Sequence, residues 1–141
     1  MTAEAIDVAL RSLEEYDWGW RTALPGVEFI GRPVGLRVDT RPVPTGGPSP
    51  PPDEVETALV RLVLGRLPEL LPVIEREYRG HADSPDVIER VHEPAVWLSR
   101  DTRAEEGPGR WAFAVGIADA PDWTIVADFD GLSFLGIWSG D

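Results

Sequence analysis

Two acidic pairs near the end of the sequence have the clearest chemical potential. Asp128 and Asp130 lie two positions apart in an extended apolar segment, so a strand would place both carboxylates on one face. Such a pair can act as general acid and base or can ligate a cation. The alternative is structural, because aspartate before glycine favours a tight turn and Asp128 on a partly solvated face needs no role. Asp119 and Asp122 flank the preceding turn, too far away to share one ion with the first pair.

Other catalytic arrangements have less support. His81 and His92 are the only histidines, and neither belongs to a metal-binding sequence of the HExxH type. The chain has no cysteine, and Ser99, Ser133 and Ser139 lack the GxSxG pattern of a nucleophile elbow. We therefore predict no catalytic residue, no metal site and no cofactor.

The six tryptophans allow a second interpretation of the same residues. Aromatic side chains more often fill a core than stack on a ligand, but several in a small domain can line a pocket. A small enzyme or ligand-binding domain would then use Asp128 and Asp130 as its polar groups. A deep cavity where these carboxylates converge with a histidine would favour this alternative.

The charge balance limits the kinds of partner. Twenty-five acidic residues against thirteen basic ones give a net charge of −12, which repels nucleic acids and anionic membranes. A basic protein is the electrostatically favoured partner, although an acidic surface can also serve solubility alone. The sequence does not indicate an oligomeric state. We place Asp119, Asp122, Asp128 and Asp130 on the candidate binding surface.

Composition predicts one cytoplasmic domain over residues 1–141. This length can bury a core without disulfides, and the absence of cysteine fits a reducing compartment. No signal peptide and no membrane-spanning segment are expected. Residues 41–52, with six prolines and two glycines, are expected to connect N-terminal extended segments to a long helix.

The first half of the chain predicts extended segments followed by this helix. Residues 3–16 fit either a strand or a helix, and we favour a strand; residues 20–24 and 34–39 should be extended. Asp53 should cap a helix that runs to Tyr78. Pro68 and Pro72 are expected on its solvent side, opposite an apolar face. That face is formed by Leu59, Leu62, Leu67, Leu70 and Ile74.

The second half predicts a short helix capped by Ser84 and then a four-stranded antiparallel meander. Its strands include 95–100 and 111–118, separated by a polar turn at 101–109, and the small-residue face of 111–118 should approach the long helix. The final hairpin should turn at Asp130-Gly131. This turn would place Phe129 opposite Leu132, Ala127 opposite Phe134 and Trp123 opposite Trp138. The expected fold class is α+β, an antiparallel sheet packed by one long proline-kinked helix.

The order of elements and the ending WTIVADFDGLSFLGI, from Trp123 to Ile137, resemble small bacterial α+β domains, several of them similar to immunity proteins of toxin systems. Where those domains carry Trp-Asp-x-Glu-His-Gly, this chain has Trp123-Thr124-Ile125-Val126, so the resemblance transfers no catalytic residue. It implies an α+β fold and a binding function. Our first hypothesis is therefore a non-enzymatic interaction protein, an immunity-type inhibitor that masks a basic toxin.

Overall fold

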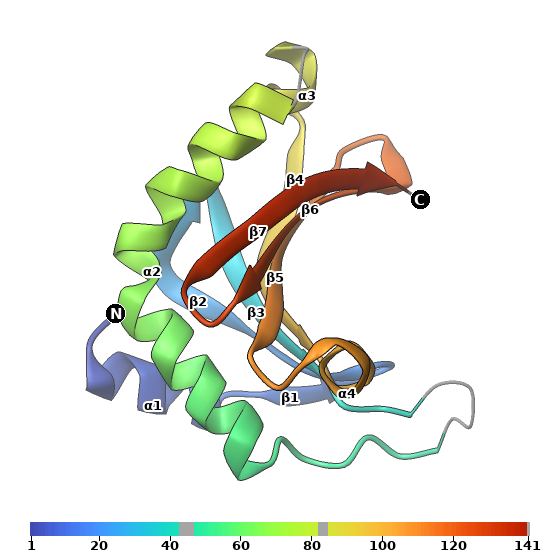
Figure 1. The fold of residues 1–141 in the computed structure, drawn as a ribbon. Helices are drawn as coiled ribbons and strands as arrows, with labels where there is room; N and C mark the ends of the chain where they lie inside the picture. Colours follow the sequence, from blue (N-terminus) through green and yellow to red (C-terminus); the bar gives the residue numbers. More distant parts are fainter. Residues whose placement is uncertain (43–46, 82–84, 141) are drawn as a thin grey trace.

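The chain forms one curved seven-stranded sheet that wraps around a long helix (Figure 1). The computed structural model describes residues 1–42, 47–81 and 85–140. The strands, in spatial as well as sequence order, are β1 (Glu14–Tyr16), β2 (Gly19–Phe29), β3 (Arg32–Asp39), β4 (Val91–Ser99), β5 (Arg110–Ile117), β6 (Ala120–Asp130) and β7 (Ser133–Gly140). The helices are α1 (Ala3–Arg11), α2 (Glu54–His81), α3 (Pro85–Glu89) and α4 (Arg100–Glu106).

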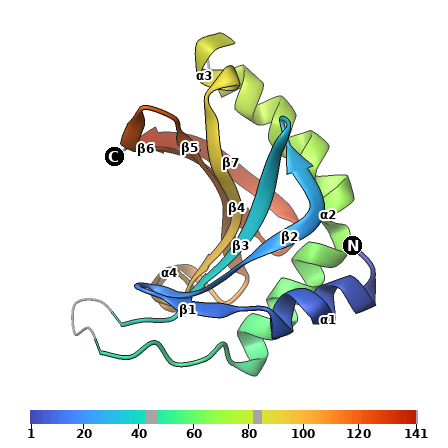
Figure 2. The same ribbon diagram turned by 180° about the vertical axis from the view of Figure 1, so that it is seen from behind.

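The α+β class and the C-terminal meander β4–β7 are confirmed. The sheet is nevertheless mixed rather than wholly antiparallel, because β3 and β4 run parallel. A parallel pair needs a long crossover connection, and α2 with α3 supplies it. Figure 2 shows α1 and α2 together on one side of the curved sheet.

The N-terminal segment differs from the expectation of a strand. It forms α1 and then the short β1. The Thr2 side chain caps α1 by accepting a hydrogen bond from the Ala5 amide at 3.1 Å. Ile6 and Ala9, three positions apart, are buried in the core, and Arg61 on α2 pairs with Asp7. Packing against α2 therefore decided between the two periodicities that the sequence allowed.

The predicted Asp53 cap of α2 is confirmed, and it is one half of a reciprocal capping box that the prediction did not include. Asp53 accepts from the Glu56 amide at 2.8 Å, and the Glu56 carboxylate accepts from the Asp53 amide at 2.9 Å. Pro68 and Pro72 are exposed, as expected. Pro68 cannot donate to the Leu64 carbonyl, and the α-amino group of Met1 donates to it instead, at 3.2 Å.

The apolar face of α2 was correct except for Leu62. Leu59, Leu67, Leu70 and Ile74 are buried, whereas 44% of Leu62 is exposed. At 100° per residue, Leu62 lies about 200° around the helix from the fully buried Val60. The stripe that contacts the sheet is centred on Val60, Val63, Leu64 and Leu67.

The segment 101–109, expected to be a turn, begins with α4. A buried charge cluster fixes this helix to α2. Glu56 is fully buried, and its carboxylate accepts from Arg100 Nε at 2.9 Å and lies 3.2 Å from Arg103 Nη1. Two guanidinium groups thus compensate one buried carboxylate, as a charge in the interior requires.

Strand β5 packs the other way round from the prediction. Its bulky residues Trp111, Phe113, Val115 and Ile117 belong to the core that contains α2. Its small residues Ala112 and Ala114 face the opposite side of the sheet. Large side chains fill the space between a curved sheet and a helix, which is why the bulky face is the inner one.

The final hairpin forms, but the expected register is wrong. Asp130 pairs with Ser133 and Phe129 with Phe134, so Gly131 and Leu132 are the two turn residues. Gly131, the first turn residue, has a φ of 58°. Asp130 pairs with Ser133 within the ladder and is therefore not a turn residue. A bulge at Leu135 shifts the pairing again. Val126 then faces Trp138, Asp128 faces Gly136 and Ala127 faces Ile137.

Two further expectations concern the connections. The proline-rich segment is held at its C-terminal end, where the Pro50 carbonyl accepts from Trp20 Nε1 at 2.9 Å and from Thr40 Oγ1 at 2.6 Å. The short helix is present as α3. Its expected cap, Ser84, lies outside the described residues.

Candidate functional site: the outer face of the sheet

The sheet has an inner face that packs on α2, and α4 borders one end of its outer face (Figures 1 and 2). One row of cross-strand partners runs along the outer face over all seven strands. The row is Glu14, Arg21, Arg37, Trp97, Ala112, Asp128 and Gly136. Charged side chains in the middle of a sheet face lose part of their hydration and need hydrogen-bond or ion-pair partners, so this row is the centre of the candidate site.

A polar cluster crosses the outer face from β1, over Gly19 of β2, to β3 and β4. Trp97 Nε1 donates to Asp39 Oδ2 at 2.7 Å, and Arg37 Nη2 donates to the same oxygen at 3.1 Å. Tyr16 donates its hydroxyl proton to Asp39 Oδ1 and accepts from Arg37 Nε at 2.8 Å. Every member of the cluster therefore has a partner, which holds these side chains in one arrangement.

The cluster changes the acidity of its phenol. Partial burial of Tyr16, its hydrogen bond to Asp39 and the charge of that carboxylate together raise the pKa of Tyr16 well above its ordinary value. Tyr16 is therefore a hydrogen-bond donor at neutral pH and not a general base. The cluster can position a partner group, but it offers no group poised to transfer a proton.

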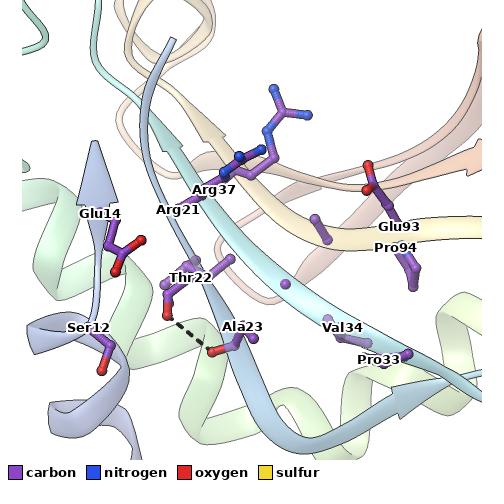
Figure 3. A pocket seen from close by; sticks show the side chains of 13 residues that line it. Ser12, Glu14, Arg21, Thr22, Ala23, Pro33, Val34, Arg37, Glu93 and Pro94 are labelled. Atoms are coloured by element: carbon purple, nitrogen blue, oxygen red, sulfur yellow. Dashed lines mark hydrogen bonds between the residues drawn. The ribbon is translucent and has the colours of Figure 1, made fainter. Parts of the chain in front are cut away.

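A hollow of about 540 Å³ opens on the β1–β4 half of the outer face (Figure 3). We call it the arginine hollow. Arg21 and Arg37 border it on one side and Glu93 on another. Gly35 and Ala95 also line it. The Arg21 guanidinium lies over the Tyr16 ring, 4.9 Å from its centroid, and forms no ion pair within the described residues. This hollow is shallow and bears charges of both signs.

A second hollow, about 310 Å³, lies at the β5–β7 end, and we call it the tryptophan hollow. Trp97, Trp111 and Trp138 line it together with Asp128. Trp138 Nε1 donates to Asp128 Oδ2 at 2.8 Å. Neither Asp130 nor a described histidine lines this hollow, so the convergence that would favour an enzyme is not found there.

The four predicted aspartates divide between the two ends of β6. Asp128 and Asp130 share the outer face, as predicted, opposite Ala112 and Arg110 of β5. Asp119, with a φ of 70°, lies in the β5–β6 turn, and Asp122 is exposed near the start of β6. The structure does not bring the two pairs together, in agreement with the strand-length argument.

The histidines and serines form one unexpected contact. His81, at the end of α2, lies 3.2 Å from the Ser139 hydroxyl of β7, measured from Nε2 to Oγ. Within the described chain no carboxylate is hydrogen-bonded to His81, so this pair lacks the third group that orients a catalytic base. His92 is exposed and lies 3.8 Å from its neighbour Glu93.

The described residues contain no group of three or more histidine or acidic side chains placed to hold a metal ion. No helix in the described ranges is long and apolar enough to span a membrane. Comparison with known protein families, with curated proteins and with solved structures found no match. The resemblance to immunity-type domains therefore stays a prediction.

The sequence did not reveal the cluster around Asp39. Its one available signal was Arg37 and Asp39, two positions apart on a strand whose opposite face is Val34, Leu36 and Val38. Their partners come from β1 and β4, and Trp97 is 58 positions away from Asp39. Only the parallel pairing of β3 with β4 places this indole beside the carboxylate.

Proposed function

We propose that this protein is a non-enzymatic binding protein that masks a basic protein partner, as an immunity-type inhibitor does. The observation that carries the proposal is how the charges are distributed. Among the described residues, eight arginines form ion pairs with acidic groups of the chain itself: Arg37, Arg61, Arg66, Arg76, Arg79, Arg100, Arg103 and Arg110. Asp119, Asp122 and Asp130 have no ion-pair partner among the described residues, so their charge is available to a partner.

Exposed tryptophans add the second element of a protein interface. Trp123 and Trp138 are 43% and 50% exposed; Trp123 lies on β6 with Asp122 and Asp130, and Trp138 lies on the neighbouring β7. Tryptophan side chains are enriched among residues that dominate binding energy, and they also attract arginine and lysine through their ring faces. Acidic groups around exposed indoles favour a partner surface rich in arginine or lysine.

The dependence of the association rate on salt concentration tests the proposal. The tagged protein would be used to capture partners from its native cells, and the association rate of a stoichiometric basic partner would be measured at increasing salt. A steep fall in that rate is expected, since electrostatic steering is screened over about 8 Å at physiological ionic strength. A rate independent of salt would contradict it.

Matched variants locate the charge effect. Converting Asp119, Asp122 and Asp130 to asparagine should slow association of that partner by roughly tenfold or more. Converting Glu4, Glu28 and Glu89 to glutamine removes the same net charge from exposed positions on other elements. If both triple variants slow association equally, the binding surface is not at the ends of β6.

The alternative, a ligand-binding domain with a tryptophan-lined pocket, has one observation in its favour. Three indoles and Asp128 do border one hollow. Its volume is at the lower end of the range for small-molecule sites, and Asp128 is already hydrogen-bonded to Trp138. We therefore keep it as the second candidate.

A further inference from the structure

The two edges of the sheet are protected very differently. At one edge, β1 is three residues long and exposes Glu14 and Glu15. Short length and charge are the usual devices that keep an edge from pairing with another strand. At the other edge, β7 extends over Ser133–Gly140 with neither a charged residue nor a proline.

The edge of β7 that faces away from β6 has no strand partner in the described structure. The strand pairs with β6, and no described strand lies beyond it. The bulge at Leu135 interrupts the ladder near the hairpin, but Gly136–Gly140 pairs regularly with β6. The side of this stretch that faces away from β6 has no strand partner among the described residues, because only one side of each edge strand is used within a sheet. The end of α2 approaches the same stretch, with His81 Nε2 3.2 Å from the Ser139 hydroxyl.

Apolar side chains accompany this open edge. Leu135 and Trp138 are 52% and 50% exposed, and Trp123 is exposed on the neighbouring strand. These three are among the few large apolar side chains that the described chain leaves in solvent. An added strand would cover Leu135 and Trp138 on β7 while its backbone completes the ladder.

The acidic charges near both ends of β7 indicate which kind of strand can pair with it. Asp130 lies at the hairpin end of β7, and Asp122 lies beyond the other end, where Thr124 pairs with Gly140. An antiparallel pair of two β7 strands would bring Asp130 of one copy toward Asp122 of the other, and each copy carries a net charge of −12. This repulsion disfavours a second copy and favours a strand with uncharged residues in its centre and basic residues at both ends.

We propose that β7 is the docking strand of this protein, and that an extended segment of a basic partner adds to the sheet there. The inference rests on the proposed binding function and specifies its geometry. Backbone hydrogen bonds would supply affinity, and the contacts with Leu135, Trp138 and the flanking aspartates would supply selectivity.

A synthetic peptide provides the test. The probe is Arg-Arg-Thr-Val-Thr-Val-Thr-Arg-Arg, and its matched control carries N-methyl groups on alternate central amides, which removes donors without changing charge. The probe should bind, slow hydrogen exchange of the β7 amides and bind roughly tenfold or more tightly than the control. Equal binding of the two peptides, binding without protection of β7, or no binding would overturn the inference.

A protein variant separates edge pairing from simple charge attraction. Leu135→Glu makes the edge more acidic, so attraction alone would strengthen binding of the basic probe, whereas lost apolar contact at the edge weakens it. We expect weaker binding, with Leu62→Glu on α2 as the control because Leu62 is similarly exposed. Stronger binding to the Leu135→Glu variant, or concentration-dependent protection of β7 without any probe, would overturn the inference, the latter in favour of self-association.

The two proposals fail in different ways. If the probe does not protect β7 while the captured partner still depends on Asp119, Asp122 and Asp130, the docking strand is wrong and the acidic binding function stands. If the partner is insensitive to salt and to these aspartates, the binding function itself is wrong.

Discussion

The indole of Trp97 donates a hydrogen bond to the carboxylate of Asp39, with 2.7 Å between Nε1 and Oδ2. This bond joins the parallel strands β3 and β4 on the outer face, where the sheet has no long helix to support it. Because Arg37 and Tyr16 donate to the same carboxylate, Asp39 organises the centre of the candidate site.

Removing the Asp39 charge should destabilise the fold. Asp39→Asn weakens three hydrogen bonds and leaves Arg37 without its ion-pair partner, so we expect a loss of about 1.5 to 3 kcal/mol in the free energy of unfolding. Denaturant unfolding monitored by fluorescence measures it. Asp17→Asn, at an exposed position, should change stability by less than about 0.5 kcal/mol. A similar loss in both variants would show that the cluster contributes nothing beyond surface charge.

Alkaline pH should destabilise the protein through Tyr16. Burial and Asp39 raise the pKa of Tyr16 in the folded state above its unfolded value, so the folded state favours the protonated phenol. The stabilisation is present below a pH of about 10 and is lost as the pH rises from there toward the folded-state pKa, since only the unfolded chain ionises in that window.

Two substitutions show how much of this pH dependence comes from each tyrosine. Burial also raises the pKa of Tyr78, so both tyrosines contribute to the alkaline slope. Tyr16→Phe should flatten part of the decline in unfolding free energy above a pH of about 10, and Tyr78→Phe should remove the rest. A Tyr16→Phe variant with an unchanged alkaline slope would contradict the role of Asp39.

Two leucines of α2 should respond differently to the same change. Leu70 is 8% exposed, so Leu70→Ala should cost about 2 to 5 kcal/mol through the cavity it leaves. Leu62 is 44% exposed, and Leu62→Ala should cost less than about 0.5 kcal/mol. Equilibrium unfolding in denaturant compares them. Equal costs would mean that the helix presents a different face to the sheet.

Two glycines of the last hairpin form a matched pair. A Cβ atom would meet nothing within 4 Å at either Gly131 or Gly136, but only Gly131 has a positive φ. Gly131→Val should therefore cost about 1 to 3 kcal/mol from backbone strain. Gly136→Val should be neutral or stabilising, because valine suits a strand. Thermal unfolding of both variants tests the assignment, and a milder effect at Gly131 would refute it.

Several features were readable without the structure because they depend on neighbours in the sequence. The cap at Asp53 needs only an amide three residues away, and the exposure of Pro68 and Pro72 follows from helical periodicity. The half-buried pattern of β3 likewise follows from alternation. Local features of this kind depend on residues that are close together in the sequence.

The register of the hairpin shows where this approach fails. Turn chemistry favoured Asp130-Gly131, yet the turn moved by one residue and a bulge at Leu135 moved the pairing again. These shifts place Asp128 opposite Gly136 and Trp138 opposite Val126, which the turn sequence alone could not predict. Side-chain packing between β6, β7 and the core outweighed the local preference of the turn.

By itself, the sequence determined the fold class, the start of the long helix, the acidic charge and the absence of recognisable catalytic patterns. The tertiary structure alone decided whether residues 3–16 form a helix, which face of β5 is inward, that Asp39 meets Trp97, and that β7 is an edge strand. The reason is physical: capping, alternation and net charge depend on short stretches or on composition, whereas burial and strand order depend on contacts between residues that are distant in the sequence.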